Sequence, residues 1–297
     1  MLELEARAEP SRLMSWASPL LAVALMLAGG LAVFAALGKD PVEGFRVFFL
    51  NPVKDLYALS ELLLKATPLM LCAIGLAIGF RANVWNIGAE GQFMLGAVAA
   101  TGVALYFGDS ESALVLPAMV LAGAAGGAAW AAIPALLRTR FNANEILVSL
   151  MLVYVAQLFV SWLVFGPWKD PDGFNFPQTR MFAEAATLPM VIEGTRLHFG
   201  FAIALAALVA GYAFMNRSHA GFRMRVAGEA VDAARYAGFS ATRMIWVGLL
   251  LGGAAAGLAG MGEVAGPMGQ LTDKVASGYG FGAIIVAFVG RPNAFGI

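Results

Sequence analysis

Long runs without Asp, Glu, Lys or Arg dominate the chain. They span residues 13–38, 66–80, 91–108, 112–137, 146–168, 197–216, 244–262 and 275–290. A membrane-spanning helix needs about 20 apolar residues, with a lower limit of about 17. Six runs are therefore long enough to cross a bilayer, and 66–80 and 275–290 are short. The pattern predicts an all-α polytopic helix bundle with about eight crossings or partial crossings.

Composition supports a membrane location. Of the 297 residues, 60% are hydrophobic and 13% charged, and the mean hydropathy is +0.77, far from the balance of a soluble domain. We therefore expect an integral membrane protein surrounded by lipid. The net charge is zero, so no basic surface for nucleic acid is expected. The one cysteine, Cys72, excludes an internal disulfide and is expected to be a small buried apolar residue.

The first run, 13–38, is predicted to be a retained anchor helix. Its apolar stretch is too long for a signal peptide, and acidic residues precede it. With the N-terminus in the cytoplasm and eight crossings, eleven Arg and Lys residues fall inside and eight outside. The positive-inside bias favours this orientation.

Polar residues lie where two apolar runs are interrupted. The sequence NVWNIGAEGQFMLGA covers 83–97, and 275–291 contains GYGFG. Short interrupted segments in a transporter indicate discontinuous helices around a solute site, predicted here around 81–92 and 275–291. Asn86, Glu90 and Gln92 would offer hydrogen bonds in the bundle interior, and Trp85, Phe93 and Tyr154 could stack on a solute. The alternative is a loop wetted by cytosol, with Glu90 capping the next helix.

A second polar cluster begins the run that follows residue 141. Asn142 or Asn144 is expected to be an N-cap, with Glu145 in the first turn. Asn144 and Glu145 are also candidate pathway residues, although the structural role suits them better.

Two connections are long. Residues 167–197 are expected outside the cell, either as a docking site for a solute-delivering partner or as a passive loop. Residues 216–243 are expected inside, with a short helix between Gly228 and Gly238. Its residues Ala233, Ala234, Arg235 and Tyr236 would form a smooth surface for another protein's groove, or only a surface helix.

Glycines four residues apart predict close helix packing, at Gly123/Gly127, Gly248/Gly252 and Gly253/Gly257. No catalytic, metal or cofactor motif is visible. The chain has two histidines and no HExxH or GxxxxGK[ST] sequence. If ATP drives this protein, another chain hydrolyses it.

Several blocks carry a resemblance to a known family. In order, they are KATPLMLCAIGLAIGFRANVWNIGAEGQFMLGA, RFNANEILVSLMLVYVA, PDGFNFPQT, GFRMRVAGEAVDAARYAGFSATR, GGAAAGLAGMGEVAG and GYGFGAIIVAFVGRPNAFGI. Together they resemble the permease subunit of nucleoside-type ABC importers, within the superfamily of ribose and branched-chain amino-acid permeases. NIGAEGQ and GYGF are typical of the nucleoside and simple-sugar branch.

The resemblance implies a bacterial inner-membrane importer working by alternating access. Its partners would be a cytosolic ABC ATPase that uses the ATP, a second and related permease subunit, and an extracytoplasmic binding protein or lipoprotein. Asn86, Glu90 and Gln92 would lie near the path, and 228–238 would couple to the ATPase. Nucleosides are the expected cargo, with simple sugars or branched-chain amino acids as alternatives; an ion-coupled transporter and a non-transporting scaffold are the other readings.

The chain departs from the family pattern at two places. Val153 stands where relatives carry an asparagine, and the sequence stops at Ile297, where relatives continue. The resemblance therefore predicts a fragment of a longer permease.

Overall fold

The computed structural model describes residues 11–290 and 296–297. In these residues it is all-α, with no strand and two isolated bridges. The chain divides after Leu62 into two compact units. Arg7 and Arg291, two of the arginines behind the predicted orientation, lie outside the described residues, as do the acidic residues that precede Ser11.

The first unit contains the predicted anchor. Helix α1 (Arg12–Ala36) has Ser11 as its N-cap, and the short α2 (Pro41–Phe45) is capped by Asp40. A π-helical turn, η1 (Arg46–Leu50), and a 3-10 turn, η2 (Asn51–Val53), follow. Phe34 packs edge-on against Phe45 with ring centroids 5.9 Å apart. This aromatic contact fixes the turn between α1 and α2.

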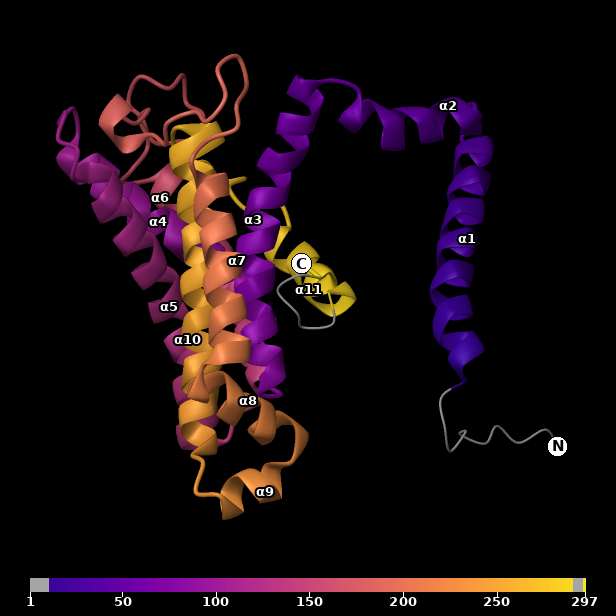
Figure 1. The fold of residues 1–297 in the computed structure, drawn as a ribbon. Coiled ribbons are helices and arrows are strands. Elements are labelled where there is room, and N and C mark those ends of the chain that lie inside the picture. The colour runs from indigo at the N-terminus through magenta and orange to yellow at the C-terminus, as the bar shows by residue number, and fades with distance from the viewer. Residues whose placement is uncertain (1–10, 291–295) are drawn as a thin grey trace. The chain divides into compact units, whose positions relative to one another are not determined.

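The second unit is a helix bundle. Helix α3 (Leu56–Arg81), whose first residues belong to the first unit, leads into α4 (Ala89–Phe107), α5 (Val115–Phe141), α6 (Glu145–Phe165), α7 (Gly200–Arg217), α8 (His219–Glu229), α9 (Val231–Tyr236), α10 (Ala241–Glu263) and α11 (Tyr279–Val289). Helices α4, α5 and α10 pack on one another and form the centre. Figure 1 shows the connection between α6 and α7 at one end of this bundle, and α8 and α9 at the opposite end.

Six helices among the described residues are long and apolar enough to cross a membrane: α1, α3, α5, α6, α7, and α10 with its π-helical extension η4 (Val264–Met268). The sequence also predicts six, but the two sets differ, because α3 is among those found and α4, predicted from the run 91–108, is not. Helix α4 has 19 residues and α11 has 11. The expectation that 66–80 is a short segment is wrong. Helix α3 has 26 residues, because Lys65 lies inside the helix rather than at its end.

Glycines bring α5 and α10 into backbone contact, as predicted. A Cβ placed on Gly257 would overlap the backbone of Gly123 and Gly127, and one on Gly127 would overlap Gly253. The absence of side chains at these positions lets the two helices approach as closely as small-residue motifs permit. Cys72, also as predicted, is fully buried.

The connection from 166 to 199 is packed on the bundle and is not a loosely solvated loop. It contains one 3-10 turn, η3 (Glu184–Ala186). The backbone N–H of Thr179 donates to the carbonyl of Leu271 at 3.0 Å, and that of Leu188 donates to Ala265 at 2.7 Å. These bonds hold the connection against the segment that follows α10. Its role in docking a partner stays a prediction.

His198 anchors the end of this connection. The residue is 4% exposed, and its Nδ1 accepts a hydrogen bond from the N–H of Gly200 at 3.1 Å. Burial lowers the pKa of His198 from 6.5 to about 4, because the apolar surroundings disfavour the charged ring.

Gly257→Ala is expected to lower the free energy of unfolding by about 1–3 kcal/mol, since the added methyl group overpacks the α5–α10 contact. Gly262 in the same helix is the matched control, because a Cβ there meets no atom within 4 Å. Gly262→Ala should be neutral or slightly stabilising, since alanine favours a helix. Thermal unfolding in detergent measures both, and equal stability of the two variants would contradict close packing at Gly257.

His198 should make stability depend on pH. The unfolded state binds a proton near pH 6.5 and the folded state only near 4, so the stabilising contribution is present above about 6.5 and is lost as pH falls towards 4. Between pH 7.5 and 5 the loss is about 2 kcal/mol. His198→Asn removes the titrating ring and keeps an acceptor for Gly200. The variant should lose less stability over this interval in parallel melting curves, and equal losses would argue against a buried neutral His198.

Candidate functional site

The segment between α3 and α4, residues 82–88, is non-helical backbone that is largely inside the bundle. Val84 and Asn86 are 1% and 2% exposed. The N–H of Val84 donates to the carbonyl of Gly79 at 3.1 Å, and the N–H of Ile87 donates to Ser149 Oγ at 3.2 Å. Non-helical backbone at membrane depth is tolerated when protein satisfies its polar groups. Of the two sequence interpretations, the buried break is therefore correct and the loop wetted by cytosol is wrong.

Asn86 and Gln92 form a reciprocal amide pair. Asn86 Nδ2 donates to Gln92 Oε1 at 2.8 Å, and Gln92 Nε2 donates to Asn86 Oδ1 at 3.0 Å. Asn86 Oδ1 also accepts from the N–H of Gly88 at 3.1 Å. Both side chains are buried, as predicted. In this conformation the amides bind each other and fix the bend that starts α4.

Glu90 joins the two interrupted helices. The residue lies in the first turn of α4 and is 3% exposed. Its Oε1 accepts from the N–H of Gly278 at 2.7 Å, and its Oε2 accepts from the N–H of Gly280 at 2.5 Å. These N–H groups belong to the start of α11, where Gly278 has φ +86°. One carboxylate thus lies at two helix N-termini, where negative charge is favoured. Glu90 therefore caps α11, a different helix from its own.

The contact also requires glycine. A Cβ on Gly280 would overlap the backbone of Glu90. The prediction that segments 81–92 and 275–291 meet is therefore confirmed up to residue 290, and the RPNAF sequence that follows lies outside the described residues.

Aromatic rings from α3, the break, α4 and α11 form two contacting groups. Phe80, Trp85 and Phe288 form a cluster with ring centroids 5.1–5.5 Å apart. Trp85 is oriented by its indole N–H, which donates to Asn83 Oδ1 at 2.7 Å. Phe93 is fully buried, and its ring centroid lies 5.8 Å from that of Tyr279.

The other candidate pathway residues lie elsewhere. Asn144 is the N-cap of α6, accepting from the N–H of Ile146 at 2.9 Å, and Glu145 pairs with Arg138 at the end of α5. These contacts close the turn between α5 and α6. Tyr154 is 62% exposed on α6, whereas Val153 is buried against α4. The structure does not bring these side chains to the amide pair.

The sequence pattern does not point to two charged residues near the break, Lys65 and Glu263. Lys65 and Glu263 contact each other at 3.8 Å, beside Tyr279. Both residues border charge-free runs in the sequence, and the structure places Lys65 within α3 and Glu263 where α10 continues into η4. An isolated charge within an otherwise membrane-length run was the available signal.

The predicted coupling segment needs a correction. The short helix α9 begins at Val231, and Gly228 lies inside α8, where a Cβ would overlap the carbonyl of Arg81. Gly238 does follow α9, with φ +74°. Ala234 is buried. Tyr236 is 97% exposed, and Ala233 and Arg235 are exposed as well. Residues 216–243 therefore contain two helices, and α8 packs against the end of α3.

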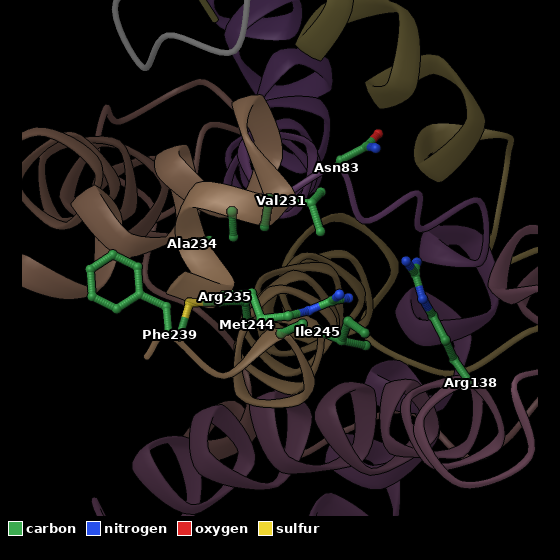
Figure 2. Close-up of a pocket in the computed structure, with 11 residues that line it drawn as sticks. Asn83, Arg138, Val231, Ala234, Arg235, Phe239, Met244 and Ile245 are labelled. Carbon is green, nitrogen blue, oxygen red and sulfur yellow. The ribbon is translucent and has the colours of Figure 1, made fainter. Parts of the chain in front are cut away.

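A cavity of about 280 Å³ lies between this segment and the polar break. Its lining includes Asn83 from the break, Arg138 from α5 and Ala234 and Arg235 from α9. Figure 2 shows Arg235 extending in the direction of Arg138. The cavity is therefore lined both by α9 and by the segment that leads to Glu90.

Glu90→Ala should loosen α11. The change leaves the N–H groups of Gly278 and Gly280 without an acceptor, which costs about 1–3 kcal/mol for each. Amide hydrogen exchange over 279–289 should rise, while peptides from α5 and α10 stay protected. Glu90→Gln, with one remaining oxygen acceptor, should be intermediate, and exposed Glu111→Gln is the control. Unchanged exchange in α11 of the alanine variant would show that Glu90 does not hold it.

Comparison with known proteins identifies the fold family. Residues 58–297 match the family described as branched-chain amino acid transport system / permease component. The chain is 40% identical over 99% of its length, and 79% of the relative's, to the glucose ABC transporter permease protein TsgB13 of Haloferax volcanii. It is 32% identical over 94% of its length, and 80% of the relative's, to the guanosine ABC transporter permease protein NupP of Bacillus subtilis.

A third relative, the nucleoside ABC transporter permease protein NupB of Lactococcus lactis, is 28% identical over 94% of the chain and 79% of its own length. No solved structure matches the chain. The buried break, the apolar helices and these similarities agree, and the chain belongs to the branched-chain amino acid permease family, as an ABC transporter permease of the nucleoside and sugar type.

Proposed function

We propose that this multi-pass membrane protein is the translocation subunit of an ATP-driven importer for a solute that contains a sugar ring. The observation that carries the proposal is the pair of helices α4 and α11, which begin inside the bundle and are joined there by Glu90. Discontinuous helices of this kind surround solute sites in transporters.

Nucleosides are the first candidate cargo. Four relatives are named for guanosine or nucleosides. The Phe80, Trp85 and Phe288 cluster offers apolar ring faces on which a base can stack. A hexose is the second candidate, because a relative with 40% identity is named for glucose. Both contain a ring with several hydroxyl groups, so the candidate site residues Trp85, Asn86, Glu90, Gln92 and Phe93 serve either.

The partners follow from the same proposal. A cytosolic ATPase uses the ATP, an extracytoplasmic binding protein delivers the solute, and a second, related permease completes the path in the cell membrane, with the N-terminus of this chain in the cytoplasm. Bacillus subtilis and Lactococcus lactis each have two related permeases that are named for the same cargo. This supports a pair of different subunits.

Coupling would run through α8 and α9. The exposed side chains Arg235 and Tyr236, with Ala233 beside them, present a surface for the ATPase. Gly228 packs against the carbonyl of Arg81, and Arg81 Nη1 donates to the carbonyl of Met215 at 2.9 Å. Movement of this surface would therefore reach the end of α3 and the break that follows it.

Uptake assays test the proposal. Cells with the intact transporter should accumulate labelled guanosine, adenosine or uridine, or else glucose or ribose, and the uptake should disappear when either this chain or the ATPase is inactivated. Uptake that persists without the ATPase would support an ion-coupled transporter instead. If removal of the chain abolishes the uptake of none of the tested solutes, the assignment to sugar-containing cargo is overturned.

A further inference from the structure

Three polar side chains from three different elements meet beside the start of α11. Lys65 comes from α3, Glu263 is the last residue of α10, and Tyr279 is the first residue of α11. Lys65 Nζ donates to the Tyr279 hydroxyl at 2.9 Å and lies 3.8 Å from Glu263 Oε1. Glu263 lies close enough to Tyr279 to interact with it electrostatically. We refer to these three residues as the outer polar cluster, because the predicted orientation puts them on the extracytoplasmic side of Glu90.

The cluster is open on one side. Glu263 and Tyr279 are 6% and 8% exposed, whereas the side chain of Lys65 is 56% exposed. A lysine in the middle of an apolar helix is costly in contact with lipid and usually faces a partner or a water-filled space. The exposed ammonium therefore lies beside two buried polar groups, Glu263 and Tyr279.

Hydrogen-bonding capacity remains in the cluster. An ammonium has three donors, and a carboxylate accepts on two oxygens. Lys65 gives one donor to Tyr279, and at 3.8 Å its contact with Glu263 is a charge interaction rather than a short hydrogen bond. Arg196 adds further positive charge near Lys65 and Glu263. The cluster can thus both donate to and accept from hydroxyl groups.

Local structure and aromatic packing suit the same use. Glu263 lies where α10 changes into the π-helical η4, and such widened turns are frequent at functional sites. Tyr279 presents a ring that lies 5.8 Å from the buried Phe93, so a polar edge and an apolar face occur together. Glu90 holds the backbone on both sides of Tyr279 through Gly278 and Gly280.

We propose that Lys65, Glu263 and Tyr279 form a solute-binding site that hydrogen-bonds the ring hydroxyls of a neutral sugar or the ribose of a nucleoside. This inference rests on the proposed function and adds to it the part of the solute that is recognised. Lys65 and Glu263 offer donors and acceptors side by side, which suits the hydroxyl groups of a polyol. The site uses none of the residues that the sequence pattern had pointed to as pathway residues.

The test compares solutes that differ by one hydroxyl. The complete transporter, with the second permease, ATPase and binding protein, is reconstituted in proteoliposomes. Initial import rates are measured for the transported solute and for its monodeoxy analogues, at concentrations that saturate the binding protein. Saturation removes the binding protein's affinity from the comparison, so the remaining selectivity belongs to the permease step.

Tyr279→Phe removes only one hydroxyl and keeps the ring. We expect the variant to import the parent solute about tenfold more slowly than the unchanged protein does. At least one deoxy analogue should be imported at the same rate by both proteins, because that analogue lacks the hydroxyl group that would bind Tyr279. Lys65→Met and Glu263→Gln should each lose the selectivity for one particular hydroxyl group of the solute, different for the two variants. Tyr106→Phe and Glu111→Gln, at exposed positions outside the cluster, are the matched controls and should keep the unchanged selectivity.

The outcomes separate the site from the function. An equal fall for every solute, with unchanged ratios between analogues, would overturn the binding site and leave the outer polar cluster a structural ion pair. The same holds if all three variants import at the unchanged rate. If the unchanged transporter imports no sugar or nucleoside at all, the proposed function itself fails. ATP hydrolysis and size-exclusion profiles of each variant verify that the assembly is intact.

Discussion

The hydrogen bonds from Gly278 and Gly280 to the carboxylate of Glu90 are the contact on which the interior of the bundle depends. The first turn of a helix has N–H groups without partners inside the helix, and inside a membrane protein no bulk water replaces them. Helix α11 has only 11 residues and a glycine N-cap without a side-chain acceptor. Such a short helix has little stability of its own. Glu90 supplies the missing acceptors, and the N-termini of both helices offset the cost of its burial.

The packing around Glu90 follows from this constraint. For its side chain to reach α11, helix α4 has to begin within the bundle, so the chain runs back from the end of α3 as extended backbone. Ser149 and the pair Asn86 and Gln92 satisfy polar groups of that segment. Glycines remove the side chains that would block it, since a Cβ on Gly88 would lie 2.8 Å from Ser149. The polar residues of NIGAEGQ thus hold one another in place before they meet any solute.

Sequence patterns predicted the helices and the meeting of two interrupted segments, because both depend on local composition. They did not predict which groups would pair. Asn86 and Gln92 are predicted to offer hydrogen bonds in the interior, and the structure pairs them with each other. The tertiary course of residues 82–88 decides that pairing. Counting charge-free runs also concealed Lys65 and Glu263, because a charge was taken as the end of a helix. Gly228 was taken as a helix boundary, yet close approach to Arg81, and not a turn, explains that glycine.

The two ends of the bundle are connected through the same short path. At one end, Gly228 of α8 packs on Arg81, the last residue of α3. Seven residues separate α3 from α4, and the backbone hydrogen bonds of Val84 and Ile87 make them a firm link. At the other end of this link Glu90 holds α11, which carries Tyr279 to Lys65. In the proposed function, a displacement of α8 would act on α11 through the break and the first turn of α4, which carries Glu90. Because α4 belongs to the packed centre, this turn would have to move with the break, whereas the glycine contacts between α5 and α10 lie outside the path.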